Sequence, residues 1–146
     1  GAFRNLLVRG YPPAGIPAGA FFHTFSRRYG IDFQENLKSV AAAWRGGVRI
    51  GVGIDIPFES EKLYPAAYFE ELDFLRQAGL SNRAILASAT SVGAGILGMD
   101  DRLGTIEPGK LADMILLRGD PEQDLAVLRD PRVVIANGRV IDGDPD

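Results

Sequence analysis

One carboxylate in this sequence stands where an α/β enzyme would place its chemistry. Asp55 follows Val48–Ile54, in which aliphatic residues at every second position alternate with an arginine and two glycines. This alternation is typical of a buried strand with little side-chain bulk on one face, and Pro57 stops the strand from continuing. α/β enzymes place chemistry at the C-terminal end of such a strand. The alternative is that Asp55 caps a turn, and this segment alone does not decide between the two.

Other residues that could do chemistry lack a supporting pattern. His23 is the only histidine and lies in the aromatic cluster Phe21–Phe25, where a packed or surface histidine is more usual than a ligand. Gly51 and Gly53 have the spacing of a dinucleotide-binding loop but lack its third glycine and the helix start that follows it. Ser91 stands at a predicted helix start without the nucleophile-elbow pattern. The absence of cysteine excludes disulfides and thiolate metal sites.

The composition is that of a single globular domain. The chain has 146 residues, of which 46% are hydrophobic and 24% charged, as in ordinary soluble domains. The net charge of −3 gives no basis for binding nucleic acid or an anionic membrane surface. No apolar run approaches the roughly 20 residues needed to span a bilayer, and the first residues lack the pattern of a signal peptide. We therefore expect a cytoplasmic protein without a membrane or nucleic-acid partner.

A helix is predicted immediately before the strand that leads to the carboxylate. Asp32 and Glu35 have the spacing of a capping box, and apolar residues follow at helical intervals as far as Trp44. Gly46 and Gly47 end this helix. A helix, a short turn and a buried strand in this order form the second half of a βαβ unit, which implies a parallel sheet.

Three further helices are predicted between residues 65 and 98. Pro65 suits the first position of one helix. Ser81 can cap the next, and either Thr90 or Ser91 can cap the third.

The character of the chain changes near residue 101, where a small β unit begins. Met114–Leu117 is a short apolar strand, and Asn137-Gly138 separates the β-branched runs Val133–Ile135 and Val140–Ile141. Asn-Gly between two such runs predicts a hairpin with a type I′ turn. Two or three strands are only marginally stable alone, so this unit needs further strands from elsewhere.

The stretch Asp101–Leu117, which contains Glu-Pro-Gly-Lys-Leu-Ala-Asp, closely resembles the C-terminal region of the amidohydrolase superfamily. Its imidazolonepropionase-related and Xaa-Pro dipeptidase-like branch is the nearest, and the resemblance covers about residues 33–142. It implies an α/β fold in which residues 1–100 are the C-terminal part of a (β/α)8 barrel, with its last strand and flanking helices. Residues 101–146 would be C-terminal strands of a small, composite β-sandwich domain.

The same resemblance implies a role for Asp55. This residue matches the aspartate that closes the eighth barrel strand, which binds or borders the metal and takes a proton from the metal-bound water. The implied cofactor is a divalent metal, zinc, and the implied substrate is a small amide-type molecule whose C–N bond is hydrolysed. Two departures from the usual pattern stand beside it: Gly53-Ile54-Asp55 replaces Gly-Thr-Asp, and Ile56-Pro57 replaces a small residue and a glycine.

The remaining family ligands have no match in this sequence. It has no His-x-His pair, and His23 lies too close to Asp55 in the chain to match a histidine of the sixth barrel strand. We therefore expect a C-terminal fragment or subunit that is inactive alone and binds no metal tightly. It would need its N-terminal part or a partner chain, and its exposed apolar faces favour a homo-oligomer. The alternative is a non-catalytic structural or assembly module that retains the fold.

Other charged residues receive structural interpretations. Glu70 and Glu71 are expected to face solvent. Lys110 and Asp113 belong to the Glu-Pro-Gly-Lys-Leu-Ala-Asp run, which we call the signature. We interpret them as turn and strand-start residues of the sandwich rather than as catalysts.

Overall fold

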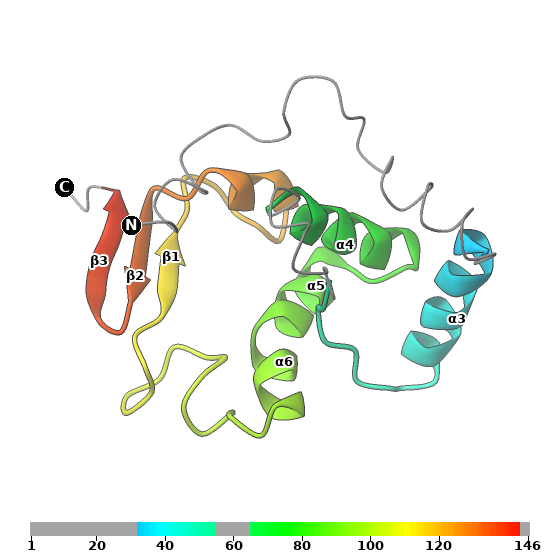
Figure 1. The fold of residues 1–146 in the computed structure, drawn as a ribbon, viewed down its shortest axis with the longest axis horizontal. Coiled ribbons are helices and arrows are strands. Elements are labelled where there is room, and N and C mark those ends of the chain that lie inside the picture. The colour runs from blue at the N-terminus through cyan, green and yellow to red at the C-terminus, as the bar shows by residue number, and fades with distance from the viewer. Residues whose placement is uncertain (1–31, 55–64, 144–146) are drawn as a thin grey trace, which may run out of the picture. The chain divides into compact units, whose positions relative to one another are not determined.

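The computed structural model describes residues 32–54 and 65–143 (Figure 1). These residues form four α-helices, one short 3-10 helix and a three-stranded sheet. In chain order the elements are α3 (Phe33–Arg45), α4 (Ala66–Gln77), α5 (Asn82–Ala89), α6 (Ser91–Ile96), β1 (Met114–Leu116), η2 (Leu125–Arg129), β2 (Val133–Ala136) and β3 (Arg139–Gly143). The described residues belong to two compact units. The first contains α3 and α4, and the second contains residues 49–52 together with 81–143.

The start of α3 is fixed by the predicted cap. The Asp32 carboxylate accepts hydrogen bonds from the backbone N–H groups of Gln34, at 2.9 Å, and Glu35, at 3.3 Å. These bonds satisfy donors that the first helical turn leaves without partners. At the same end of the helix, the Phe33 ring packs edge-on against Phe74 of α4, with the ring centroids 4.6 Å apart. The cap therefore also positions the contact between the two helices.

Both helices of the first unit end in a glycine with a positive φ. Gly47 follows α3 with φ +80°, and Gly79 follows α4 with φ +99°. The residue after each glycine donates its backbone N–H to a carbonyl five residues earlier, at 3.0 and 3.1 Å. This is the Schellman arrangement, which satisfies the last carbonyls of a helix. The prediction that Gly46-Gly47 ends α3 is thus confirmed.

The buried side chains of the first unit are mostly small or aliphatic. Most of them lie on α4 or on the residues that follow it: Ala67, Leu72, Leu75, Ala78 and Leu80. Leu75 and Leu80 flank the Schellman turn, so the same turn that ends α4 also buries two leucines. Pro65 immediately precedes α4, one residue earlier than the first helical position predicted for it.

Residues 48–54 do not form the predicted strand in the described structure. The segment has no regular secondary structure, and Val48 is 54% exposed. A strand requires a neighbouring strand for its ladder of hydrogen bonds. The described strands pair only with one another, in an antiparallel sheet ordered β1-β2-β3. The parallel sheet expected from the order of helix and strand is therefore not present in the part of the chain that the structure describes.

The two helices of the second unit begin differently. The Ser81 hydroxyl accepts a hydrogen bond from the Ala84 N–H at 3.3 Å, which confirms it as the cap of α5. At the start of α6, the Thr90 hydroxyl instead donates to the Leu86 carbonyl at 2.7 Å and makes no cap. Of the two predicted alternatives, Thr90 is the N-cap residue of α6, but it makes no side-chain cap because its hydroxyl bonds back into the helix that precedes it.

The predicted hairpin is present. β2 and β3 pair antiparallel, and the turn residues Asn137 and Gly138 have φ of 50° and 73°. Two consecutive positive φ values are what a type I′ turn requires. The pairing contains an irregularity between Val134 and Ile135. No helix within residues 32–54 or 65–143 is long and apolar enough to cross a membrane.

Candidate functional site

Asp55, the predicted catalytic and metal-binding residue, lies outside the described residues, and so does His23. The approach to Asp55 through residues 48–54 is described. Its middle part, residues 49–52, belongs to the same compact unit as α5 and α6. The packing of these four residues is therefore relevant to Asp55, because they precede it in the chain.

Residues 49–52 lie directly against α5 and α6. The backbone N–H of Val52 donates to the Ser88 carbonyl at 3.3 Å. A Cβ atom added at Gly51 would lie 3.1 Å from Cδ1 of Ile96 and 3.8 Å from Cα of Gly93. A glycine at this position lets the backbone approach α6 closely. Gly51 thus serves packing, and its spacing from the next glycine needs no nucleotide-binding explanation.

The described residues do not themselves form a metal site. Within residues 32–54 and 65–143, no group of three or more histidine, cysteine, aspartate or glutamate residues is placed to hold a metal ion. Metal sites in proteins are built from such groups. A metal centre in this protein would require ligands from outside the described segments.

The second unit contains an open cavity of about 690 Å³ that the sequence did not predict. One wall is formed by residues of α5 and α6, and the others by the turn around residues 103–111 and by parts of β1 and β2. Its lining is mostly aliphatic, and its polar side chains come from Ser88, Thr90, Thr105 and Asp113. The cavity was missed because its lining combines residues from Val52 to Ile135, which no local sequence pattern connects.

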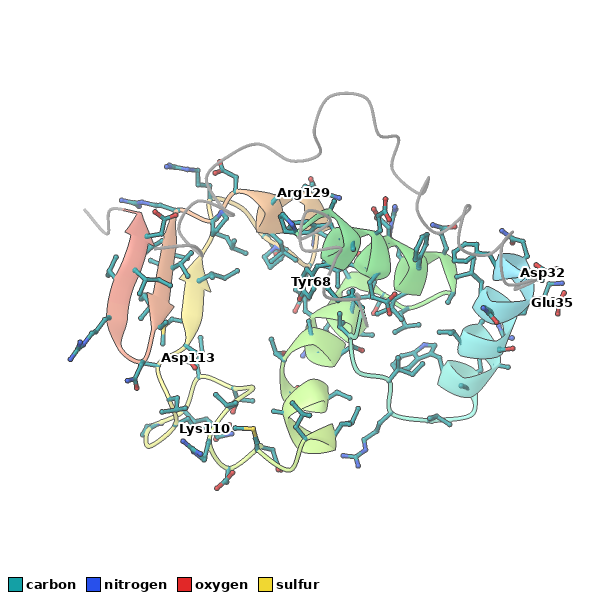
Figure 2. All side chains as sticks on the ribbon, in the orientation of Figure 1. Asp32, Glu35, Tyr68, Lys110, Asp113 and Arg129 are labelled. Carbon is teal, nitrogen blue, oxygen red and sulfur yellow. The ribbon has the colours of Figure 1, made fainter. Side chains whose placement is uncertain are left out.

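Lys110 stabilises the turn at residues 102–111, which we call the signature turn (Figure 2). Its Nζ donates to the Thr105 hydroxyl at 2.5 Å and lies 3.5 Å from a carboxylate oxygen of Glu107. The side chain is only 15% exposed. The backbone N–H of Leu111 donates to the Arg102 carbonyl at 2.9 Å and closes the same turn. Lys110 is therefore a turn residue, as predicted.

Gly104 brings this turn into contact with α6. It has φ +88°, and a Cβ atom placed on it would lie 2.8 Å from both Cβ of Ala94 and Cα of Ser91. Side chains essentially never approach backbone that closely, so only glycine fits here. The close contact forms one corner of the cavity.

Asp113 connects the signature to the hairpin through a hydrogen bond. Its Oδ1 accepts a hydrogen bond from the backbone N–H of Asn137 at 2.6 Å. The carbonyl of the neighbouring Ala112 accepts from the N–H of Gly138 at 3.0 Å. In Figure 2 Asp113 stands at the start of β1, beside the hairpin turn. This confirms Asp113 as a strand-start residue and identifies the hairpin turn as its partner.

Glu71 is not the solvent-facing residue that the sequence predicted. It is half-buried in α4, and this burial raises the pKa of its carboxyl above the usual glutamate value. Burial also raises the pKa of Tyr68, one turn earlier on the same helix. Desolvation disfavours the charged form of an acid. Glu70 has the same intermediate exposure, so neither glutamate is fully solvent-facing, and their adjacency in the sequence gave no sign of this.

Comparisons with known proteins identify similar chains. A family model described as the amidohydrolase family matches residues 21–141. The 5-methylthioadenosine/S-adenosylhomocysteine deaminase of Desulforudis audaxviator is 36% identical over 97 residues, which are 58% of this chain and 23% of that protein.

Solved structures with a similar fold were also found. A Xaa-Pro dipeptidase with methionine bound in its active site has a TM-score of 0.64 and 31% identity, over 73% of this chain and 25% of its own. An amidohydrolase from Thermotoga maritima has a TM-score of 0.58 and 27% identity, over 74% of this chain and 26% of its own. The chain thus spans about a quarter of the length of these proteins.

Proposed function

Because this chain belongs to the amidohydrolase family, we propose that it supplies the C-terminal part of a metal-dependent hydrolase that uses water to break a C–N bond. The observation that carries this proposal is the family match over residues 21–141, which includes Asp55 and the whole signature turn. Two of the relatives whose names state an activity are a deaminase and a dipeptidase. Both names denote the removal of a nitrogen group from carbon by water, so a C–N bond is the feature their substrates share.

The proposed architecture follows the family. Residues 1–100 would be the last part of a (β/α)8 barrel, with Val48–Ile54 as its final strand, and residues 101–146 would be strands of a β-sandwich. The close packing of Gly51 against α6 supports a fixed position for this segment. A neighbouring barrel strand would supply the ladder of hydrogen bonds that the segment lacks in the described structure.

Asp55 would act as the proton-transfer group of the reaction. A divalent metal, zinc in this proposal, supplies a water molecule of lowered pKa when it is bound. The Asp55 carboxylate would accept a proton as the water oxygen bonds to the substrate carbon, and would return it to the leaving nitrogen as the C–N bond breaks. A position at a strand end would hold the carboxylate more precisely than a loop. Most metal ligands, and with them activity, would come from polypeptide outside this chain.

The proposed substrate is a small molecule with an amide, cyclic amide or dipeptide bond, and the proposed location is the cytoplasm. Ile54 stands where the family usually has threonine, so the hydroxyl group at this position is replaced by an aliphatic side chain. This change would make the surroundings of Asp55 less polar. We therefore infer a substrate whose contact near Asp55 is apolar.

A second candidate is a non-catalytic assembly module. Two features of the sequence favour it: the chain has a single histidine, and Ile54 and Ile56-Pro57 replace the residues that the family usually has there. The coding region upstream discriminates between the two. An in-frame His-x-His sequence there supports the hydrolase, and a reading frame without it supports the module.

A chimera tests the proposal. Residues 21–141 of this chain replace the matching quarter of the Xaa-Pro dipeptidase, and hydrolysis of an Xaa-Pro dipeptide is measured in the presence of zinc. We expect turnover, and we expect Asp55→Asn to lower it at least about a hundredfold, the usual contribution of an acid–base group. Glu59 follows Asp55 closely in the sequence and has no assigned role, so Glu59→Gln is the matched control and should retain most of the activity. Equal activity in the Asp55→Asn and Glu59→Gln chimeras would refute the role of Asp55.

A further inference from the structure

The hairpin turn contains a pair of residues whose chemistry the proposed function does not use. Asn137-Gly138 is the one Asn-Gly pair in the sequence. In such a pair the backbone nitrogen after the asparagine is unshielded, because glycine has no side chain, and it can attack the asparagine side-chain amide. Both residues are exposed. The two other asparagines that the structure describes, Asn36 and Asn82, lie in helices and precede larger residues.

Attack by this nitrogen removes the side-chain amide without any cofactor. The lone pair of the Gly138 nitrogen forms a bond to Cγ of Asn137, and the bond between Cγ and the amide nitrogen breaks. That amide nitrogen leaves as ammonia, with the proton that the Gly138 nitrogen gives up. A five-membered succinimide ring remains, and water opens it at either carbonyl to leave aspartate or isoaspartate, each with a new carboxylate. The pair therefore carries every group that the reaction needs except water.

Two hydrogen bonds oppose this attack in the folded hairpin. The N–H of Gly138, which is the attacking group, donates to the Ala112 carbonyl at 3.0 Å. The N–H of Asn137 donates to Oδ1 of Asp113 at 2.6 Å. Together they hold the type I′ turn, in which the two residues have φ of 50° and 73°. Ring closure requires the Gly138 nitrogen to rotate toward the Asn137 side chain, so the turn must first open locally.

We propose that Asn137 is a site of spontaneous deamidation, and that the hydrogen bond to Asp113 sets its rate by limiting how often the turn opens. The change is not reversed when the turn closes again. An aspartate at position 137 brings a second carboxylate close to Asp113, and like charges repel. An isoaspartate lengthens the backbone of a turn in which only two residues connect the strands. The modified hairpin is therefore less stable than the original one, whether or not the chain is part of a hydrolase.

Peptide mapping by mass spectrometry measures this modification directly. The purified full chain is incubated in neutral buffer, and the loss of the side-chain amide is followed at each asparagine. Asn137 should lose its amide faster than Asn36 and Asn82. Asp113→Ala should speed the loss at Asn137 about tenfold, because a hydrogen bond to a charged group changes the population of the open turn by this factor.

Asp120→Ala is the matched control, since Asp120 accepts the backbone N–H of Glu122 at 2.8 Å in a different turn. It should leave the rate at Asn137 unchanged. An equal increase in both variants would overturn the proposal, because a general loss of stability would then explain it, and so would an unchanged rate in Asp113→Ala. If Asp113→Ala does not fold, the milder Asp113→Asn replaces it, since a neutral acceptor weakens the bond; a rate equal to that of wild type would then overturn the proposal.

Two further measurements test the protection and its consequence. Wild type should lose the Asn137 amide faster in a denaturing concentration of urea than in buffer, and equal rates would overturn the protection by the folded turn. Asn137→Asp, which carries one of the two products, should have a lower urea midpoint than wild type at neutral pH. The difference should vanish in acid, where the carboxylates are neutral. Equal midpoints at neutral pH would overturn the claim that the modification destabilises the hairpin.

Discussion

Residues 133–143 and residues 48–54 are both rich in β-branched and aliphatic side chains, yet only the first region forms strands. The hairpin of β2 and β3 contains its own pairing partner, and its turn is held from outside by Asp113 and Ala112. No strand of the described residues lies beside the segment that leads to Asp55, and its described backbone hydrogen bonds join Val48 to Ala43 and Val52 to Ser88, both within helices. The difference shows that β-rich composition becomes a strand only where a neighbouring strand completes the ladder.

The hairpin and the signature turn are thus held by contacts within the described chain, whereas no described strand pairs with residues 48–54. If this comparison is correct, substitutions in the signature turn and hairpin should destabilise the isolated chain. Substitutions within residues 48–54 should affect it little.

The largest effect is expected at Gly104. Gly104→Ala would place Cβ 2.8 Å from atoms of Ala94 and Ser91 and force a side chain onto a residue with φ +88°. We expect a loss of about 3 kcal/mol in the free energy of unfolding, measured by urea denaturation. Gly109→Ala is the matched control, since Gly109 also has a positive φ, +93°, but its Cβ would meet no atom within 4 Å in the part of the chain that the structure describes. It should cost only about 1 kcal/mol, and an equal cost for both variants would contradict the close contact with α6.

A smaller loss is expected at Asp113. Asp113→Ala removes the acceptor for the Asn137 N–H at the hairpin turn. A hydrogen bond to a charged group contributes about 1.5 kcal/mol, and urea denaturation should show a loss of that order. Asp113→Asn keeps an acceptor oxygen in the same place and should lose less. A loss as large as that of Asp113→Ala would show that the charge, not the hydrogen bond, holds the turn.

Gly51 should give an effect close to zero in the isolated chain. The Cβ atom of Gly51→Ala would lie 3.1 Å from the end of the flexible Ile96 side chain, which can move. This small strain opposes the stabilisation of about 0.5 kcal/mol that alanine gives by restricting the unfolded chain. Gly53→Ala, whose Cβ would have no atom of the described residues within 4 Å, is the control. A loss of unfolding free energy for Gly51→Ala as large as that for Gly104→Ala would contradict the difference between the two regions.

The pH dependence of stability should reveal the buried carboxyl of Glu71 in the first unit. Burial raises the pKa of this group above 4.5, its usual value, so the folded chain binds this proton more tightly than the unfolded chain does. Its stabilising contribution is present below pH 4.5 and is lost as the pH rises through the folded pKa. Wild type should therefore lose stability relative to Glu71→Gln as the pH increases from 4 to 8. Parallel urea midpoints for the two proteins over this range would contradict the burial of Glu71.

The parts of the fold that sequence predicts well are those with a short-range physical signal. Asp32 and Ser81 cap their helices through side chains two or three residues from the bonded N–H, and Asn137-Gly138 adopts the type I′ turn that this residue pair favours between strands. Thr90 makes no side-chain cap because its hydroxyl reaches the carbonyl of Leu86 in the preceding helix. The local sequence allows both a cap at the start of α6 and a hydrogen bond back to the preceding helix, so it does not predict which of the two forms.

The candidate site was predictable only in part. The resemblance identifies Asp55 and the signature turn, but the cavity joins segments from Val52 to Ile135 and has no local pattern. The burial of Glu71 likewise depends on what packs against α4, which adjacent acidic residues do not indicate. The Asp113–Asn137 hydrogen bond spans 24 residues, so the sequence identified both ends without indicating that they meet.

Zinc content measures most directly whether this chain carries one carboxylate of a centre that other polypeptide completes. The purified chain and the dipeptidase chimera are dialysed against zinc and then buffer, and bound metal is determined by mass spectrometry. The account predicts no stoichiometric zinc in the chain alone, stoichiometric zinc in the chimera, and a marked loss of zinc from the chimera on Asp55→Asn. Stoichiometric zinc in the chain alone, or a chimera that keeps all its zinc without Asp55, would contradict it.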